Sequence, residues 1–107
     1  MKYLISGSGG PGFASPDEAL RILENIVLPG FDALIDLQKK GKILAGGLPV
    51  GDRAFTFIME ADSNNEVDRV LRKIPLWGLL DWEVVALQTV EERAALEREI
   101  VKQLKGA

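Results

Sequence analysis

Cysteine and histidine are both absent from this chain of 107 residues. The lack of cysteine excludes disulfides, thiol nucleophiles, iron–sulfur clusters and thiolate zinc sites. The lack of histidine excludes a Ser-His-Asp triad and a histidine-ligated metal, and it removes the side chain whose ordinary pKa lies nearest neutrality. We therefore expect no metal and no cofactor, and any proton transfer must use a carboxylate, a lysine or a tyrosine.

Excess charge and long hydrophobic runs are also lacking. The 13 basic and 16 acidic residues give a net charge of -3 with no basic patch, so we expect no binding to nucleic acid or to an anionic membrane. Every apolar run is broken within a few residues, and the N-terminal MKYLISG lacks the apolar core of a signal peptide. We expect a cytoplasmic protein whose residues 1–107 form one domain.

Three helix-start signals divide the chain, each a hydroxyl residue followed three positions later by a glutamate. They begin at Ser15, Ser63 and Thr89. Runs rich in β-forming residues predict four strands, at 2–6, 42–47, 54–61 and 82–88. The resulting order is β-α-β-β-α-β-α. Pro29 falls inside the first helical pattern, where it removes a backbone donor, so that helix must kink or restart.

This order predicts the ferredoxin-like βαββαβ fold with an added C-terminal helix, an α+β arrangement in which both main helices cover one face of an antiparallel four-stranded sheet. The other face should be polar if it meets water, yet the third and fourth strands are mainly apolar on both sides. A second copy packed sheet against sheet would cover that face and form a homodimer, a dimeric α+β barrel. The alternative is that the terminal helix folds back over the sheet.

One segment resembles a known family. Residues 74–87, IPLWGLLDWEVVAL, are similar to the segment with which the muconolactone isomerase family enters its last strand. The resemblance implies a dimeric α+β barrel, in some members a decamer, with a small-molecule cavity between sheet and helices or within the barrel. Where the family carries His and Lys on the first strand, this chain reads KYLIS, so the histidine has no counterpart.

Two functions follow from these observations, since a fold alone does not fix an activity. The first is a cofactor-independent isomerase, or other proton-transfer enzyme, acting on a small cyclic carbonyl compound such as a lactone or an aromatic breakdown product. The second is a non-catalytic dimeric module that binds a small molecule or serves a structural role. The missing histidine favours the second function, and an Asp-x-Glu pair in the similar segment keeps the first one open.

That pair, Asp81 and Glu83, lies two residues apart on a predicted strand, so both side chains point to the same face. Burial and mutual repulsion would raise the pKa of one of the two and make it a better base. Arg53, Tyr3 or Lys42 would then donate a hydrogen bond to the enolate. The alternative is structural, with Asp81 ending a turn and Glu83 pairing with a basic residue across the dimer interface.

The catalytic candidates are therefore Glu83, Asp81 and Arg53. The substrate-binding candidates are Tyr3, Trp82, Phe57 and Lys42. For Trp82, stacking on a planar ligand competes with packing in the core, which is the more common role of tryptophan. Glu60 and Asp62, where the third strand ends, either gate a cavity or mark the point at which the strand leaves the core, and we favour the second interpretation.

A glycine-rich loop follows the first strand. Residues 7–12, GSGGPG, satisfy the G-x-G-x-x-G pattern of dinucleotide-binding sites. In such sites the helix begins within the motif, whereas here Pro11 intervenes and the helix signal begins only at Ser15. We therefore predict that this loop is a mobile lid or a plain connection.

Overall fold

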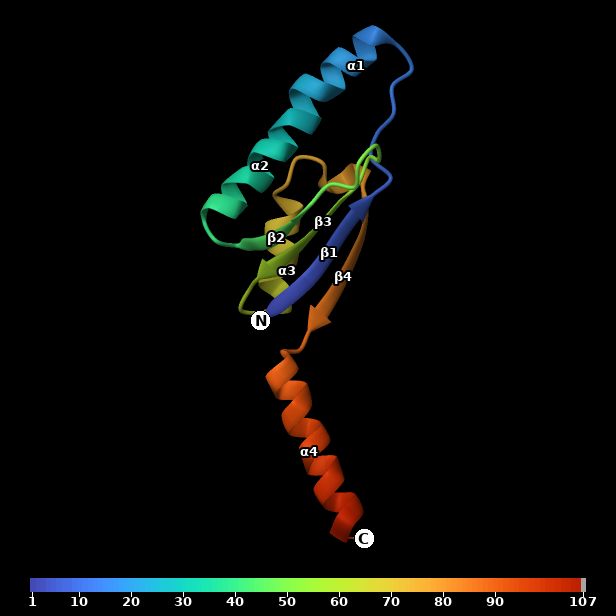
Figure 1. The fold of residues 1–107 in the computed structure, drawn as a ribbon. Helices are drawn as coiled ribbons and strands as arrows, with labels where there is room; N and C mark the ends of the chain where they lie inside the picture. Colours follow the sequence, from blue (N-terminus) through green and yellow to red (C-terminus); the bar gives the residue numbers. More distant parts are fainter. Residues whose placement is uncertain (107) are drawn as a thin grey trace.

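The computed structural model describes residues 1–106 and confirms the predicted order of elements (Figure 1). The strands are β1 (Lys2–Ser8), β2 (Ile43–Gly47), β3 (Phe55–Glu60) and β4 (Asp81–Leu87). The helices are α1 (Pro16–Ile22), α2 (Leu28–Lys39), α3 (Asn64–Arg72) and α4 (Val90–Gly106). A π-helical turn, Leu23–Val27, joins α1 to α2, and a short 3-10 helix, Trp77–Leu79, precedes β4.

The four strands form one antiparallel sheet in the order β2-β3-β1-β4, as the ferredoxin-like prediction requires. Alternate side chains of β1 and β3 point toward the helices and are buried. These core side chains are Tyr3, Ile5, Phe55, Phe57 and Met59. Leu34 of α2 and Val67 and Leu71 of α3 pack against them, so the helices and this face of the sheet enclose one hydrophobic core.

All three predicted helix caps are present, and they explain where the helices begin. The hydroxyls of Ser15, Ser63 and Thr89 each accept a hydrogen bond from the backbone N–H three residues later, at 3.2, 3.1 and 3.0 Å. At the first two caps a glutamate completes the exchange by accepting from the N–H before the cap, at 3.3 Å for Glu18 and 2.6 Å for Glu66. These local bonds satisfy donors that the first helical turn leaves unpaired.

The restart expected at Pro29 takes the form of the π-helical turn. Pro29 has no N–H to donate to the carbonyl of Asn25, so a regular α-helix cannot pass through this position. The N–H of Leu28 instead reaches the carbonyl of Leu23, five residues back. The wider turn lets the chain continue as α2 without a break, since a π-helical turn absorbs such a local mismatch.

The second face of the sheet, which we call the open face, carries no helix of the described chain (Figure 1). The register places the partly exposed apolar side chains of Leu4, Ile58, Val85 and Leu87 on it. The expected apolar second face is present only in part, because the polar side chains of Ser6, Thr56, Asp81 and Glu83 lie on the same face. The alternative in which the terminal helix folds back over the sheet is wrong, because α4 points away from the sheet beyond the end of β4.

Candidate functional site

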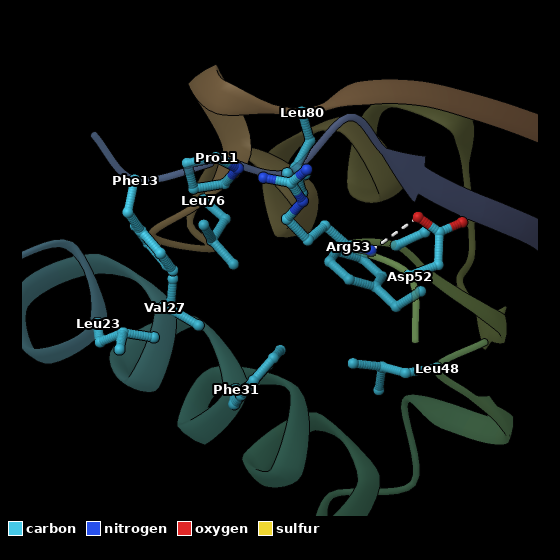
Figure 2. A pocket seen from close by; sticks show the side chains of 13 residues that line it. Pro11, Phe13, Leu23, Val27, Phe31, Leu48, Asp52, Arg53, Leu76 and Leu80 are labelled. Atoms are coloured by element: carbon cyan, nitrogen blue, oxygen red, sulfur yellow. Dashed lines mark hydrogen bonds between the residues drawn. The ribbon is translucent and has the colours of Figure 1, made fainter. Parts of the chain in front are cut away.

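A cavity of about 270 Å³ lies between the helical side of the molecule and the start of β3 (Figure 2). Helical residues form one wall, the glycine-rich loop forms part of the rim, and the loop before β3 closes the far side. Its apolar lining side chains are Pro11, Phe13, Leu23, Val27, Phe31, Leu48, Ala54, Phe55, Leu76 and Leu80. A mostly apolar hollow of this size suits a small organic molecule.

Two charged side chains, Asp52 and Arg53, belong to the lining. Both are exposed, so they lie at the mouth of the cavity rather than in its floor. The Asp52 Oδ1 accepts a hydrogen bond of 2.7 Å from the backbone N–H of Arg53. This bond orients the carboxylate, and the Arg53 guanidinium forms no ion pair with any of residues 1–106. The pocket thus offers one acceptor and one cationic donor beside an apolar chamber.

The glycine-rich loop packs directly on Arg53. The N–H of Gly10 donates to the Arg53 carbonyl at 3.0 Å, which ties the loop to the start of β3. A Cβ atom at Gly10 would lie 2.9 Å from the Arg53 Cβ, and one at Gly12 would lie 2.6 Å from Nη1. The two glycines therefore provide the space in which the Arg53 side chain lies at the rim.

Two of the predicted catalytic residues lie elsewhere. Glu83 pairs with Ser6 and Asp81 with Ser8 in the β1–β4 register, so both carboxylates lie on the open face, as their spacing predicted. Both side chains are exposed, so the expected burial is wrong for the described chain. The cavity lies on the other side of the sheet, and neither carboxylate lines it. The Asp81 carboxylate lies beside Gly9, where an added Cβ would be 3.2 Å from Oδ2, and the next residue, Gly10, packs on Arg53.

Trp82 and Phe57 belong to the core rather than to the surface of this cavity. The Trp82 indole N–H donates to the carbonyl of Trp77 at 3.0 Å, which satisfies its polar edge. Its ring packs edge-to-face on Phe55, with centroids 5.4 Å apart, and Phe55 lines the cavity. Phe57 is buried and borders a neighbouring hollow of about 260 Å³ beneath α2. Trp82 therefore supports the cavity wall from behind.

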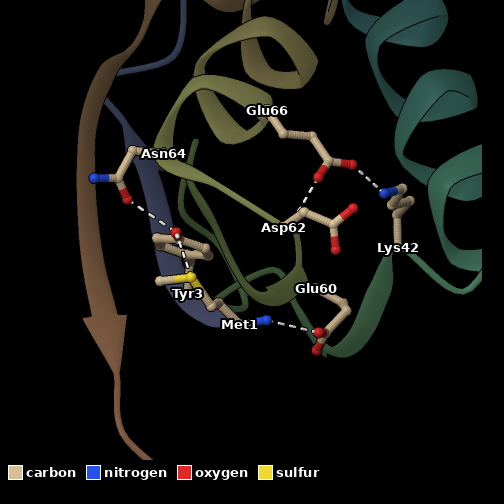
Figure 3. Close-up of polar contacts among 7 residues, drawn as sticks. All are labelled: Met1, Tyr3, Lys42, Glu60, Asp62, Asn64 and Glu66. Carbon is tan, nitrogen blue, oxygen red and sulfur yellow. Dashed lines mark hydrogen bonds and ion pairs between the residues drawn. The ribbon is translucent and has the colours of Figure 1, made fainter.

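Tyr3 and Lys42 lie at the opposite end of the sheet from Arg53, where Figure 3 shows them among other polar side chains. The Tyr3 hydroxyl donates to the Asn64 Oδ1 at 2.9 Å, which ties β1 to the start of α3. The Lys42 ammonium pairs with the Glu66 carboxylate. Both side chains thus have structural partners within the chain.

The Glu66 carboxylate contacts both the backbone N–H of Asp62 and the Lys42 ammonium (Figure 3). The backbone N–H of Asp62, and after it the Lys42 ammonium, lower the pKa of the Glu66 carboxyl. The hydrogen bond to Glu66 in turn raises the pKa of Lys42. Glu60 accepts a 2.8 Å hydrogen bond from the N-terminal ammonium, which lowers the pKa of its carboxyl as well. Glu60 therefore marks the point at which β3 leaves the core, as the favoured interpretation has it. It lies away from the cavity.

We expect Glu66→Gln to destabilise the protein in a pH-dependent way. A carboxyl whose pKa is lowered by folding contributes stability above its unfolded pKa, about 4.3, and loses that contribution as the pH falls through the lower folded value. The variant should therefore melt at a lower temperature than the parent at pH 7, and the difference should shrink below pH 4. Thermal unfolding followed by circular dichroism from pH 3 to 8 measures this. Glu24→Gln, an exposed glutamate of the π-helical turn, is the matched control, and an equal loss at pH 3 and pH 7 would contradict the assignment.

Asp52 is the cavity residue that the sequence analysis does not single out. It lies in the turn between β2 and β3, where aspartate is common for purely local reasons. The sequence feature that could have indicated Asp52 is its position next to Arg53, because two opposite charges just before an apolar strand are typical of the exposed edge of a cavity. Among residues 1–106, no group of three potential ligand side chains could hold a metal ion. Nor is any helix in that range long and apolar enough to cross a membrane.

Comparisons with known proteins give consistent results. The family model described as muconolactone delta-isomerase matches residues 30–93. The fold is similar to a crystal structure of muconolactone isomerase, with a TM-score of 0.68, 19% sequence identity, and coverage of 83% of this chain and 90% of that one. It is also similar to 5-chloro-2-hydroxyhydroquinone dehydrochlorinase from Burkholderia phenoliruptrix AC1100 in complex with 2,5-dihydroxybenzoquinone, with a TM-score of 0.61, 23% identity, and coverage of 86% and 98%. No curated protein matches the sequence significantly.

Proposed function

The chain belongs to the muconolactone delta-isomerase family, whose model spans more than half of it, and from this premise we propose that it is a cytoplasmic, homodimeric, cofactor-independent isomerase. Its substrate class would be a small cyclic carbonyl compound, a lactone or a product of aromatic breakdown. The observation that supports this proposal is the apolar cavity with Asp52 and Arg53 at its mouth. Both similar structures, a muconolactone isomerase and a hydroxyhydroquinone dehydrochlorinase, are enzymes named for small cyclic compounds.

The chemistry needs one base and one donor. An isomerisation beside a carbonyl removes a proton from one carbon and returns a proton to another carbon of the same conjugated system, so there is no net change in protons. Asp52 is the base in this proposal, and it protonates the second carbon once the enolate has formed. Arg53 donates hydrogen bonds to the oxygen on which negative charge develops. Apolar walls strengthen both interactions by excluding water.

The predicted roles of Glu83 and Asp81 stay predictions. In a dimer that packs sheet against sheet, their carboxylates would lie at the interface, where they either reach a shared cavity or pair with basic residues of the second copy. Tyr3 and Lys42 would contact substrate only at the far end of the sheet, away from Asp52 and Arg53.

A non-catalytic small-molecule-binding module is the second candidate. The lack of histidine favours it, because the side chain whose ordinary pKa lies nearest neutrality is not available as a base. The cavity and Arg53 would serve binding equally well in such a module.

An ultraviolet assay with muconolactone and related enol-lactones separates the two functions. We expect turnover by the parent protein and a loss of about 100-fold in kcat for Arg53→Gln, the usual effect of removing one donor to a developing oxyanion. Glu83→Gln is assayed beside it, and unchanged turnover would remove Glu83 from the mechanism. If the parent binds these compounds in calorimetry without turnover, the binding module is the correct function.

A further inference from the structure

Helix α4 has no partner within the described chain. It runs for 17 residues beyond β4, and none of its residues approaches another helix or strand closely (Figure 1). The elongated chain measures 70 × 25 × 22 Å and has a radius of gyration of 18.6 Å, against about 13 Å for a compact chain of this length. Residues 94–106 also lie outside the segment that the family model matches.

One side of α4 is mainly apolar. Its large exposed hydrophobic side chains are Val90, Leu96, Ile100, Val101 and Leu104. With Ala94 they fall on one half of the helical circumference at 100° per residue, a half that also holds Arg93 and Glu97, whereas Glu91, Arg98, Glu99 and Lys102 occupy the other half. An amphipathic helix of this kind buries its apolar side against another surface.

The apolar side of α4 continues the open face of the sheet. A hollow of about 570 Å³ lies at the junction, and both the end of β4 and the first turns of α4 line it. Leu87 of the open face and Val90 and Ala94 of α4 share this hollow with Arg93, whose Nε donates to the Gln88 side chain at 3.0 Å. One partner surface can therefore cover the sheet and the helix together.

The amount of exposed surface indicates how large that partner contact is. The chain exposes 7502 Å², about 1,600 Å² more than the roughly 5,900 Å² expected of a compact monomer of this mass. If two copies each bury that excess, the interface reaches about 3,200 Å², within the range of obligate homodimers. A two-fold contact would also cover both open faces at once, because the same surface serves on each copy.

We propose that α4 is an assembly arm whose apolar side packs on a second copy of this chain, in one interface with the open face of the sheet. The inference rests on the proposed homodimer and assigns α4 a role in it. The arm reaches past its own sheet, so it contacts the body of the partner rather than its own. The charged side of α4 stays in water.

Sedimentation velocity of the full-length protein tests this with two matched variants. Ile100→Glu places a carboxylate on the apolar side of α4, and Lys102→Glu places one on the charged side. We expect Ile100→Glu to weaken dimerisation about 100-fold or more, since burial of one isoleucine accounts for a tenfold to hundredfold change and the two-fold axis applies the change twice. Lys102→Glu should change the dissociation constant by less than about threefold.

Val85→Glu, on the open face, distinguishes the arm from the dimer itself. If Val85→Glu separates the copies and Ile100→Glu does not, the sheet interface stands and the role of α4 is overturned. If the parent protein stays monomeric at 100 µM, both the role of α4 and the proposed dimer are overturned. The same holds if the monomer binds phosphatidylcholine vesicles, because the apolar side of α4 would then contact lipid rather than a second copy. Fluorescence of Trp77 and Trp82, both in the body of the fold, verifies that each variant keeps its core.

Discussion

Gly46→Ala should destabilise the protein more than any other single methyl group added to the sheet. Gly46 lies in β2 with a φ of +133°, a region that other residues rarely adopt. A Cβ atom there would collide with the Thr56 carbonyl oxygen and lie 2.5 Å from the Phe57 Cα. Both are backbone atoms of β3, which cannot move without breaking the pairing. We expect a loss of about 4 kcal/mol, or a melting temperature lower by roughly 15–30 °C.

Gly47→Ala is the matched control, because the neighbouring glycine has no atom within 4 Å of the added Cβ. Its melting temperature should change by only a few degrees at the same protein concentration. Thermal unfolding followed by circular dichroism measures both variants. A Gly46→Ala protein as stable as Gly47→Ala would show that β2 does not pair with β3 in the register described.

Asp52→Asn should have the largest effect on turnover if the proposed function is correct. The asparagine oxygen can still accept the hydrogen bond from the Arg53 N–H, so the turn and the rim keep their shape. The amide cannot take a proton, and loss of a general base lowers kcat by about 100-fold to 10,000-fold. Substrate binding should change far less, because the apolar walls are untouched.

The measurement is kcat and KM in the ultraviolet assay, with Asp36→Asn as the control. Asp36 is an exposed carboxylate of α2 that pairs with Lys40 and does not line the cavity. A turnover of Asp52→Asn within twofold of the parent would exclude Asp52 as the base. The predicted carboxylates of β4 would then be the next candidates.

Much of the fold could be predicted from the sequence because its signals are local. A hydroxyl residue and a glutamate three positions later need only one another to start a helix, and all three such starts are confirmed. Each strand was located to within two residues, since alternating apolar runs bounded by glycine or a cap have few other solutions. The antiparallel ferredoxin-like order followed from the order of these elements.

The site was harder to predict because it depends on which elements meet in space. Asp52 and Arg53 reach the cavity through the path of an irregular loop, and that path depends on contacts with Gly10 and Gly12 more than 40 residues away in sequence. The spacing of Asp81 and Glu83 correctly predicted that both lie on one face of the sheet. It could not predict that this face is the one away from the cavity. The shift in β2–β3 pairing between Ile43 and Ala45 likewise has no local sequence signal.

The isolation of α4 links its helical structure to mass action. A helix of 17 residues without tertiary contacts is only marginally formed in water, because nucleating a helix is costly and each added residue returns little. In the proposed dimer most of its order comes from association, so dilution would fray this tail while the caps and core of the body remain folded. The helical content of such a dimer would be a function of protein concentration.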